Sequence, residues 1–198
     1  MAIMTTAEAW SDIWPHEDRP MTVTDLERVP DDGNRYELDD GMLIVSPAPF
    51  NNHQFVVARL QMILGLACPP EFIVLSGPGL NLSATQHRVP DLAVVRTEGF
   101  KIDYVFEARP PLLAVEVSSR STALYDRIRK KAVYEQYRIP SYWIVTPDPE
   151  HPAVTIFELA DGWYRQIAQA DGDEVLDAAL PFPVSVIPAL LVNTDPLR

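Results

Sequence analysis

The chain has 198 residues, and 16 Lys or Arg against 28 Asp or Glu give it a formal net charge of −12. This length favours one domain with a substantial core, and an apolar fraction of 47% excludes a largely disordered chain. A charge of −12 argues against indiscriminate nucleic-acid binding, because phosphates are neutralised by Lys and Arg. The single cysteine, Cys68, excludes an internal disulfide and a multi-cysteine zinc site.

The sequence shows no sign of a membrane or export segment. No apolar run reaches the roughly 18 residues that a membrane span requires. Residues 1–20 mix acidic side chains with Trp10 and Trp14 and lack the basic-then-apolar order of a signal peptide. The expected location is therefore the cytoplasm, with no membrane partner.

In the first third of the chain, turn signals separate short elements. A short helix is expected at 24–28, and residues 35–45 read as two strands around an Asp-Asp-Gly turn, which predicts a β-hairpin. A helix capped by Asn51 or Asn52 follows, because apolar residues recur at helical spacing up to residue 67.

Strands dominate the rest of the chain. Extended runs are expected at 72–76, 79–83, 92–95, 112–117, 142–146, 153–159 and 163–168. The apolar run 112–117 is typical of a central strand buried on both faces. A helix from Ser121 to about Arg138 follows it, so 112–146 is predicted to be a parallel crossover. The fold class expected is α/β, an α+β mixed sheet with a helix before and after its central strands.

Two carboxylates coincide with predicted strands. Asp91 follows Pro90 at the start of one strand, and Glu116 interrupts an apolar run. If these strands are neighbours, both carboxylates converge at one edge of the sheet, and paired carboxylates suit Mg²⁺. The alternatives are a turn role for Asp91 and a salt bridge from Glu116 to Arg127 or Arg129. Without metal, two close carboxylates repel, so Glu116→Gln is expected to stabilise the metal-free protein.

Glu37 and Lys130 are the further candidates. Glu37, on the first strand of the hairpin, can contribute to an ion directly or through water; the alternative is a solvent-facing strand residue. Lys130 shares one stripe of its helix with Tyr134 and Tyr137. A lysine there can orient an attacking water or neutralise charge on a phosphate. The alternative is a solvated helix cation.

Five segments in succession resemble one protein family. They are 35–41 (RYELDDG), 88–95 (RVPDLAVV), 114–119 (AVEVSS), 125–134 (YDRIRKKAVY) and 139–145 (IPSYWIV). In this order they resemble the bacterial family described as putative restriction endonucleases, formerly a domain of unknown function, in the PD-(D/E)XK nuclease superfamily. The resemblance covers about residues 22–160, with an N-terminal helical extension at 1–21 and a C-terminal extension at 161–198 within a single domain.

The resemblance implies a restriction-endonuclease-like core that hydrolyses DNA phosphodiester bonds with Mg²⁺, for which Mn²⁺ can substitute. It implies Asp91 and Glu116 as metal ligands with the Val117 carbonyl as a third, and Glu37 completing the shell through water. Lys130 is then the residue that positions the nucleophile.

One position departs from the superfamily pattern. The lysine usually expected two residues after the second acid is Ser118 here, and the resemblance implies that Lys130 replaces it. Lys131 is the competing assignment. Periodicity favours Lys130, and so does the match to the family's Lys-x-x-x-Tyr spacing.

Basic side chains gather next to the proposed metal site. Residues 120–138 hold six basic residues and two acidic ones, so Arg127 and Lys131 are candidates for contacting a phosphate backbone. The alternative is a solvated helix face. His53 is a third candidate substrate contact, although a cap or packing role is favoured.

Two other functional classes stay open, a non-enzymatic nucleic-acid or protein binding module on the same fold and a metal phosphoesterase for a smaller substrate. For a nuclease with one metal site per chain, cutting both strands requires two copies, so a homodimer is expected. The N-terminal tryptophans and the apolar tail 182–191 are the candidate contact surfaces; the alternative is that they cover the sheet of a monomer.

Overall fold

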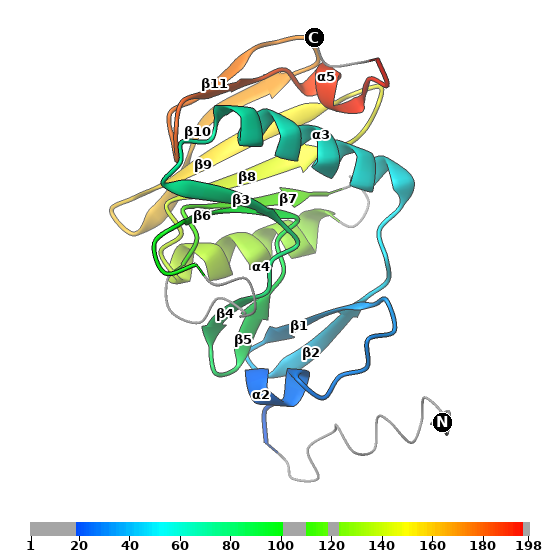
Figure 1. Cartoon of the computed structure of the whole chain (residues 1–198), viewed down its shortest axis with the longest axis vertical. Helices are drawn as coiled ribbons and strands as arrows, with labels where there is room; N and C mark the ends of the chain where they lie inside the picture. The colour runs from blue at the N-terminus through cyan, green and yellow to red at the C-terminus, as the bar shows by residue number, and fades with distance from the viewer. Residues whose placement is uncertain (1–18, 101–109, 119–122, 196–198) are drawn as a thin grey trace. The chain divides into compact units, whose positions relative to one another are not determined.

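The computed structural model describes residues 19–100, 110–118 and 123–195, with the backbone alone for 123–127 (Figure 1). The expected helix around Trp10 and Trp14 lies outside these ranges. The chain groups into two compact units. The hairpin unit comprises 19–48 and 79–89, and the sheet unit comprises 49–78, 90–100, 110–118 and 123–195. The single domain expected from the length stays a prediction.

The hairpin unit contains a four-stranded antiparallel sheet in the order β2-β1-β5-β4. Its elements are α2 (Val23–Leu26), β1 (Arg35–Asp39), β2 (Met42–Ser46), β4 (Leu80–Ser83) and β5 (Gln86–Arg88). The predicted hairpin is confirmed as β1 and β2. Gly41 ends their turn with φ of +82°, and a Cβ there would lie 2.2 Å from Cβ of Pro20. Only glycine fits this position without displacing the backbone.

The sheet unit contains a six-stranded mixed sheet in the order β10-β9-β8-β7-β6-β3. Its strands are β3 (Phe72–Ser76), β6 (Leu92–Arg96), β7 (Leu113–Val117), β8 (Ser141–Thr146), β9 (Ala153–Ala160) and β10 (Trp163–Asp171). β7 and β8 are parallel and are joined through α4 (Ala123–Gln136), so the predicted crossover is confirmed. The other neighbouring strands are antiparallel. The expected mixed α+β class is confirmed.

Two helices pack against the central strands β7 and β8, whose residues are all buried. α3 (Asn51–Ala67) places Val56 and Leu60 in one core cluster with Val115 and Val117 of β7. Alternate β7 residues point to the opposite face. On that face α4 contributes Tyr134, whose ring centroid lies 5.3 Å from that of Tyr142 on β8. The central strands are therefore covered on both faces, as their apolar sequence predicts.

The C-terminal tail folds back onto the sheet unit. β11 (Leu176–Ala178), β12 (Val184–Val186) and α5 (Pro188–Val192) follow β10. Phe182 and Leu191 are buried in the same core as α3, and Arg59 of α3 donates to the Asn193 carbonyl at 2.7 Å. Of the two roles expected for this tail, the structure shows the covering one.

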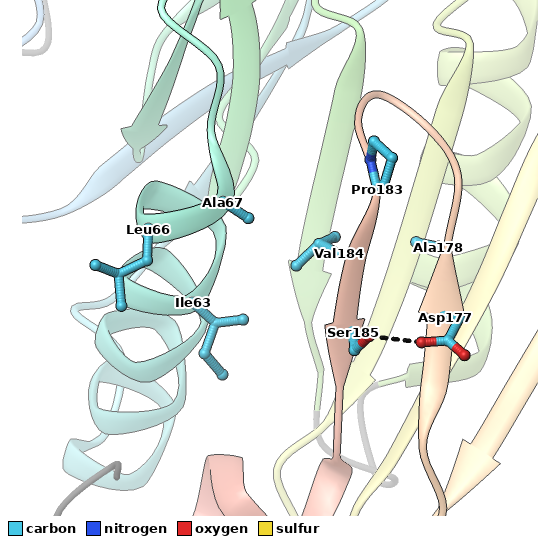
Figure 2. A pocket seen from close by; sticks show the side chains of 8 residues that line it. All are labelled: Ile63, Leu66, Ala67, Asp177, Ala178, Pro183, Val184 and Ser185. Atoms are coloured by element: carbon cyan, nitrogen blue, oxygen red, sulfur yellow. Dashed lines mark hydrogen bonds between the residues drawn. The ribbon is translucent and has the colours of Figure 1, made fainter.

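A solvent-open pocket of about 600 Å³ lies between the C-terminal half of α3 and the β11–β12 hairpin (Figure 2). Ile63 and Leu66 line it from the helix, and Val184 and Pro183 line it from the hairpin. No helix within the described ranges is long and apolar enough to cross a membrane.

Candidate active site

Asp91 is fixed against the neighbouring strand β7. Its backbone N–H donates to the Val115 carbonyl at 3.0 Å, and its Oδ2 accepts from the Val117 N–H at 2.7 Å. Leu92 lies opposite Val115 in the antiparallel register, so β6 and β7 are the neighbours that convergence of the carboxylates requires. The Asp91 side chain is only 4% exposed. Its backbone and side-chain bonds to β7 explain why this buried carboxylate keeps one orientation.

Glu116 lies on the face of β7 that α4 covers, with its side chain 7% exposed. Its Oε2 accepts from Lys130 Nζ at 2.9 Å, and its Oε1 accepts from the Tyr134 hydroxyl at 2.7 Å. The two donors are four residues apart on α4 and therefore share one side of the helix. A cation and a hydroxyl thus compensate the burial of this carboxylate. Lys130 accordingly forms the salt bridge that the sequence assigned, as one alternative, to an arginine.

The neighbouring lysines of α4 have different partners. Lys130 contacts Glu116, whereas Lys131 Nζ lies 4.9 Å from the ring centroid of Phe157 and 6.0 Å from that of Tyr164. Successive helix residues point about 100° apart, so only one of them reaches the carboxylate. The helical stripe with Tyr134 predicts this difference. The side chain of Arg127, the other expected phosphate contact, lies outside the described part of the chain.

Glu37 is buried in the hairpin unit: it is 3% exposed, and its Oε1 accepts from the Val89 N–H at 2.8 Å. The alternative of a solvent-facing strand residue is therefore wrong. Asp39 and Arg88 form an ion pair at 2.7 Å in the same sheet. The structure brings Asp91, Glu116 and Lys130 into the sheet unit, while Glu37 belongs to the hairpin unit.

His53 contacts Asp91 directly. The N-cap residue of α3 is Phe50, and Asn51 and Asn52 already lie inside the helix, so the predicted asparagine cap is wrong. In the first turn of the helix, His53 Nε2 lies 3.0 Å from Asp91 Oδ2. Its Nδ1 is buried and has no hydrogen-bond partner among the described residues. The first turn of α3 therefore supplies a polar partner to the carboxylate.

In the stretches of chain that the structure describes, no three His, Cys, Asp or Glu side chains gather closely enough to form a metal centre by themselves. Two carboxylates nevertheless fit Mg²⁺, which prefers oxygen ligands and keeps several waters. Ser118, two residues after Glu116, has a buried hydroxyl with no hydrogen-bond partner among the same residues. An ion-bound water would satisfy such a group. The donor set of Asp91 and Glu116 therefore fits the cation that the resemblance implies.

Tyr134 is the member of this group that the sequence did not identify as a site residue. From the sequence, Tyr134 was expected only to share one helical stripe with Lys130. The spacing Lys-x-x-x-Tyr places both side chains on one face of the helix, and that spacing is the signal that pairs Tyr134 with Glu116.

The sheet, its two covering helices and the buried carboxylates beside a lysine define a restriction-endonuclease-like protein. Residues 23–191 match the model of the Uma2 family, whose description is "Putative restriction endonuclease". The chain belongs to this family.

A solved structure has the same fold. It is the crystal structure, at 1.96 Å resolution, of a protein described as "a putative nuclease belonging to DUF820" from Anabaena variabilis ATCC 29413. Its sequence is 16% identical, and the match has a TM-score of 0.65 and covers 87% of this chain and 98% of that one. No curated protein matches the sequence.

Proposed function

We propose that this protein is a Mg²⁺-dependent endonuclease that hydrolyses DNA phosphodiester bonds. The observation that carries the proposal is the constellation in the sheet unit: Asp91 and Glu116 at adjacent strands, with Lys130 Nζ 2.9 Å from Glu116. Membership of a family whose description is "Putative restriction endonuclease" supports the same reaction class.

Asp91 and Glu116 are the residues that would hold the ion, with the Val117 carbonyl as a further proposed ligand. When bound, Mg²⁺ polarises a phosphoryl oxygen and lowers the pKa of a bound water. Val117 N–H and His53 fix the Asp91 carboxylate from two directions. This arrangement requires no covalent intermediate.

Lys130 supplies a positive charge at the same edge of the sheet. Its side chain is 13% exposed, so its charge acts in a medium that screens it less than water does. A fixed ammonium group there orients the attacking water and neutralises charge that develops on the phosphate. Lys131, one position further along α4, is the proposed contact to the DNA backbone.

A second candidate is a phosphoesterase for a smaller substrate. The net charge of −12 favours it, because a long polyanion is repelled more strongly than a small phosphoester. The chemistry at Asp91, Glu116 and Lys130 is the same for both candidates. They differ only in what surrounds the reacting phosphate.

The test is cleavage of supercoiled plasmid with Mg²⁺, with Mn²⁺ and with EDTA. Wild type is expected to nick the plasmid with either metal and not with EDTA. Glu116→Ala should abolish nicking, whereas Glu150→Ala, at an exposed glutamate, should retain it. Nicking by Glu116→Ala at the wild-type rate would refute the proposed site.

Two further measurements separate the alternatives. Hydrolysis of bis(p-nitrophenyl) phosphate without plasmid nicking would favour the smaller substrate. A mobility shift of DNA in EDTA, together with the absence of cleavage in either metal, would favour a binding module.

A further inference from the structure

Tyr134 is completely buried and its hydroxyl contacts Glu116. Its exposure is 0%, and its hydroxyl donates to Glu116 Oε1 at 2.7 Å. Its ring packs against Tyr142, which in turn packs against Phe157 and Tyr164. An aromatic ring held on its neighbours has few alternative rotamers, so its hydroxyl is fixed relative to β7.

The two donors on Glu116 differ in what they do to a cation. Lys130, on Oε2, carries a positive charge and competes with any cation for the carboxylate. Tyr134, on Oε1, is a neutral donor, so it restrains the carboxylate without cancelling its charge. A bound cation would therefore compete with Lys130 at Oε2, whereas the Tyr134 hydroxyl can keep its hydrogen bond to Oε1.

We infer that Tyr134 is a positioning residue that holds Glu116 in the orientation in which it binds a divalent cation. This inference rests on the proposed function, because it takes Glu116 as a metal ligand. Groups that hydrogen-bond a ligating carboxylate orient it, and their loss typically lowers metal affinity about 10- to 100-fold. A purely packing role would need the ring of Tyr134 and not its hydroxyl.

Tyr134→Phe tests the inference because it removes the hydroxyl and keeps the ring. The readout is the affinity of the full chain for Mn²⁺ and Mg²⁺, measured by calorimetry without substrate. The expected result is binding weakened about 10- to 100-fold. Tyr164→Phe is the matched control: it removes another buried hydroxyl of the same aromatic group, which donates to the Ile139 carbonyl at 2.7 Å. The affinity of Tyr164→Phe for both cations should equal that of wild type.

A double-variant comparison separates positioning from general damage. In a Glu116→Gln background, Tyr134→Phe should leave the remaining cation affinity unchanged, because the carboxylate that it positions is already absent. An equal loss in that background would overturn the inference, as would equal affinities of wild type and Tyr134→Phe. Wild type that binds neither cation would instead overturn the proposed function.

Discussion

Glu116→Gln in the metal-free protein is a direct test of how the buried carboxylates are balanced. The substitution keeps the size of the side chain and removes its charge. The amide oxygen can still accept from Tyr134, but the amide NH₂ then takes the place of the oxygen that lies 2.9 Å from Lys130 Nζ. Two donors would face each other there, and the lysine would lose Glu116 as a counter-ion.

The contacts give the sign and the size of the effect. Removing one partner of a buried ion pair costs about 3–5 kcal/mol. Because the Lys130 side chain is 13% exposed, it can turn towards water and recover part of this cost, so we expect a loss of about 2 kcal/mol. Repulsion from Asp91 alone would give the opposite sign, which is the stabilisation expected from the sequence alone, without the Lys130 ion pair. However, Asp91 and Glu116 each have their own donors, so the ion pair outweighs the repulsion.

Thermal and urea unfolding in EDTA measure this difference. At this chain length about 2 kcal/mol corresponds to a fall in Tm of about 4–8 °C. Glu150→Gln, at an exposed glutamate, is the control and should leave Tm unchanged. A higher Tm for Glu116→Gln in EDTA would refute the reasoning, since repulsion between the carboxylates would then dominate. Added Mg²⁺ should raise the Tm of wild type by mass action and leave that of Glu116→Gln unchanged.

Three further predictions follow from the same contacts and from the proposed reaction. Lys130→Ala should lower the single-turnover cleavage rate about 10²- to 10³-fold, whereas Lys131→Ala should mainly weaken DNA binding as salt rises; equal rate losses would contradict the assignment. Burial lowers the pKa of His87 in the folded protein below the value of about 6.5 that it has in the unfolded chain. The contribution of His87 to stability is therefore complete above about pH 6.5, and it is lost as the pH falls towards the lower folded pKa. Urea unfolding at pH 7.5 and pH 5 should show this loss of stability, and the loss should be smaller in His87→Gln. The same pH dependence in wild type and His87→Gln would show that His87 is not its source. We also propose a homodimer, which light scattering at micromolar concentration tests, and a monomeric mass would refute it.

The helices and strands of the sheet unit were predicted well from the sequence where the hydrophobic pattern and the order of segments along the chain decide the structure. Asp91 immediately precedes β6 and Glu116 lies on β7, and strands close in sequence are commonly neighbours. Helical periodicity and the Lys-x-x-x-Tyr spacing of the family both favoured Lys130 over Lys131, because a helix separates adjacent side chains by a known angle.

The burial of polar side chains and the packing of segments far apart in the chain could not be predicted from the sequence. β5 consists of Gln86, His87 and Arg88, which carry no strand pattern and are buried in part because Arg88 pairs with Asp39. The contact of His53 with Asp91 depends on where α3 begins relative to β6, which local propensity does not specify. The grouping of residues 79–89 with the N-terminal strands is likewise a tertiary property.

The two carboxylates are restrained from opposite sides of one sheet, since His53 comes from α3 and both Tyr134 and Lys130 come from α4. The spacing of the site is therefore set by the thickness of two hydrophobic layers rather than by a loop. A cavity-forming change such as Leu60→Ala, in the layer beneath α3, would let that helix settle and carry His53 with it. Substitutions in the core that touch no polar group can thus move His53 relative to Asp91, so the geometry of the site depends on side chains that are not part of it.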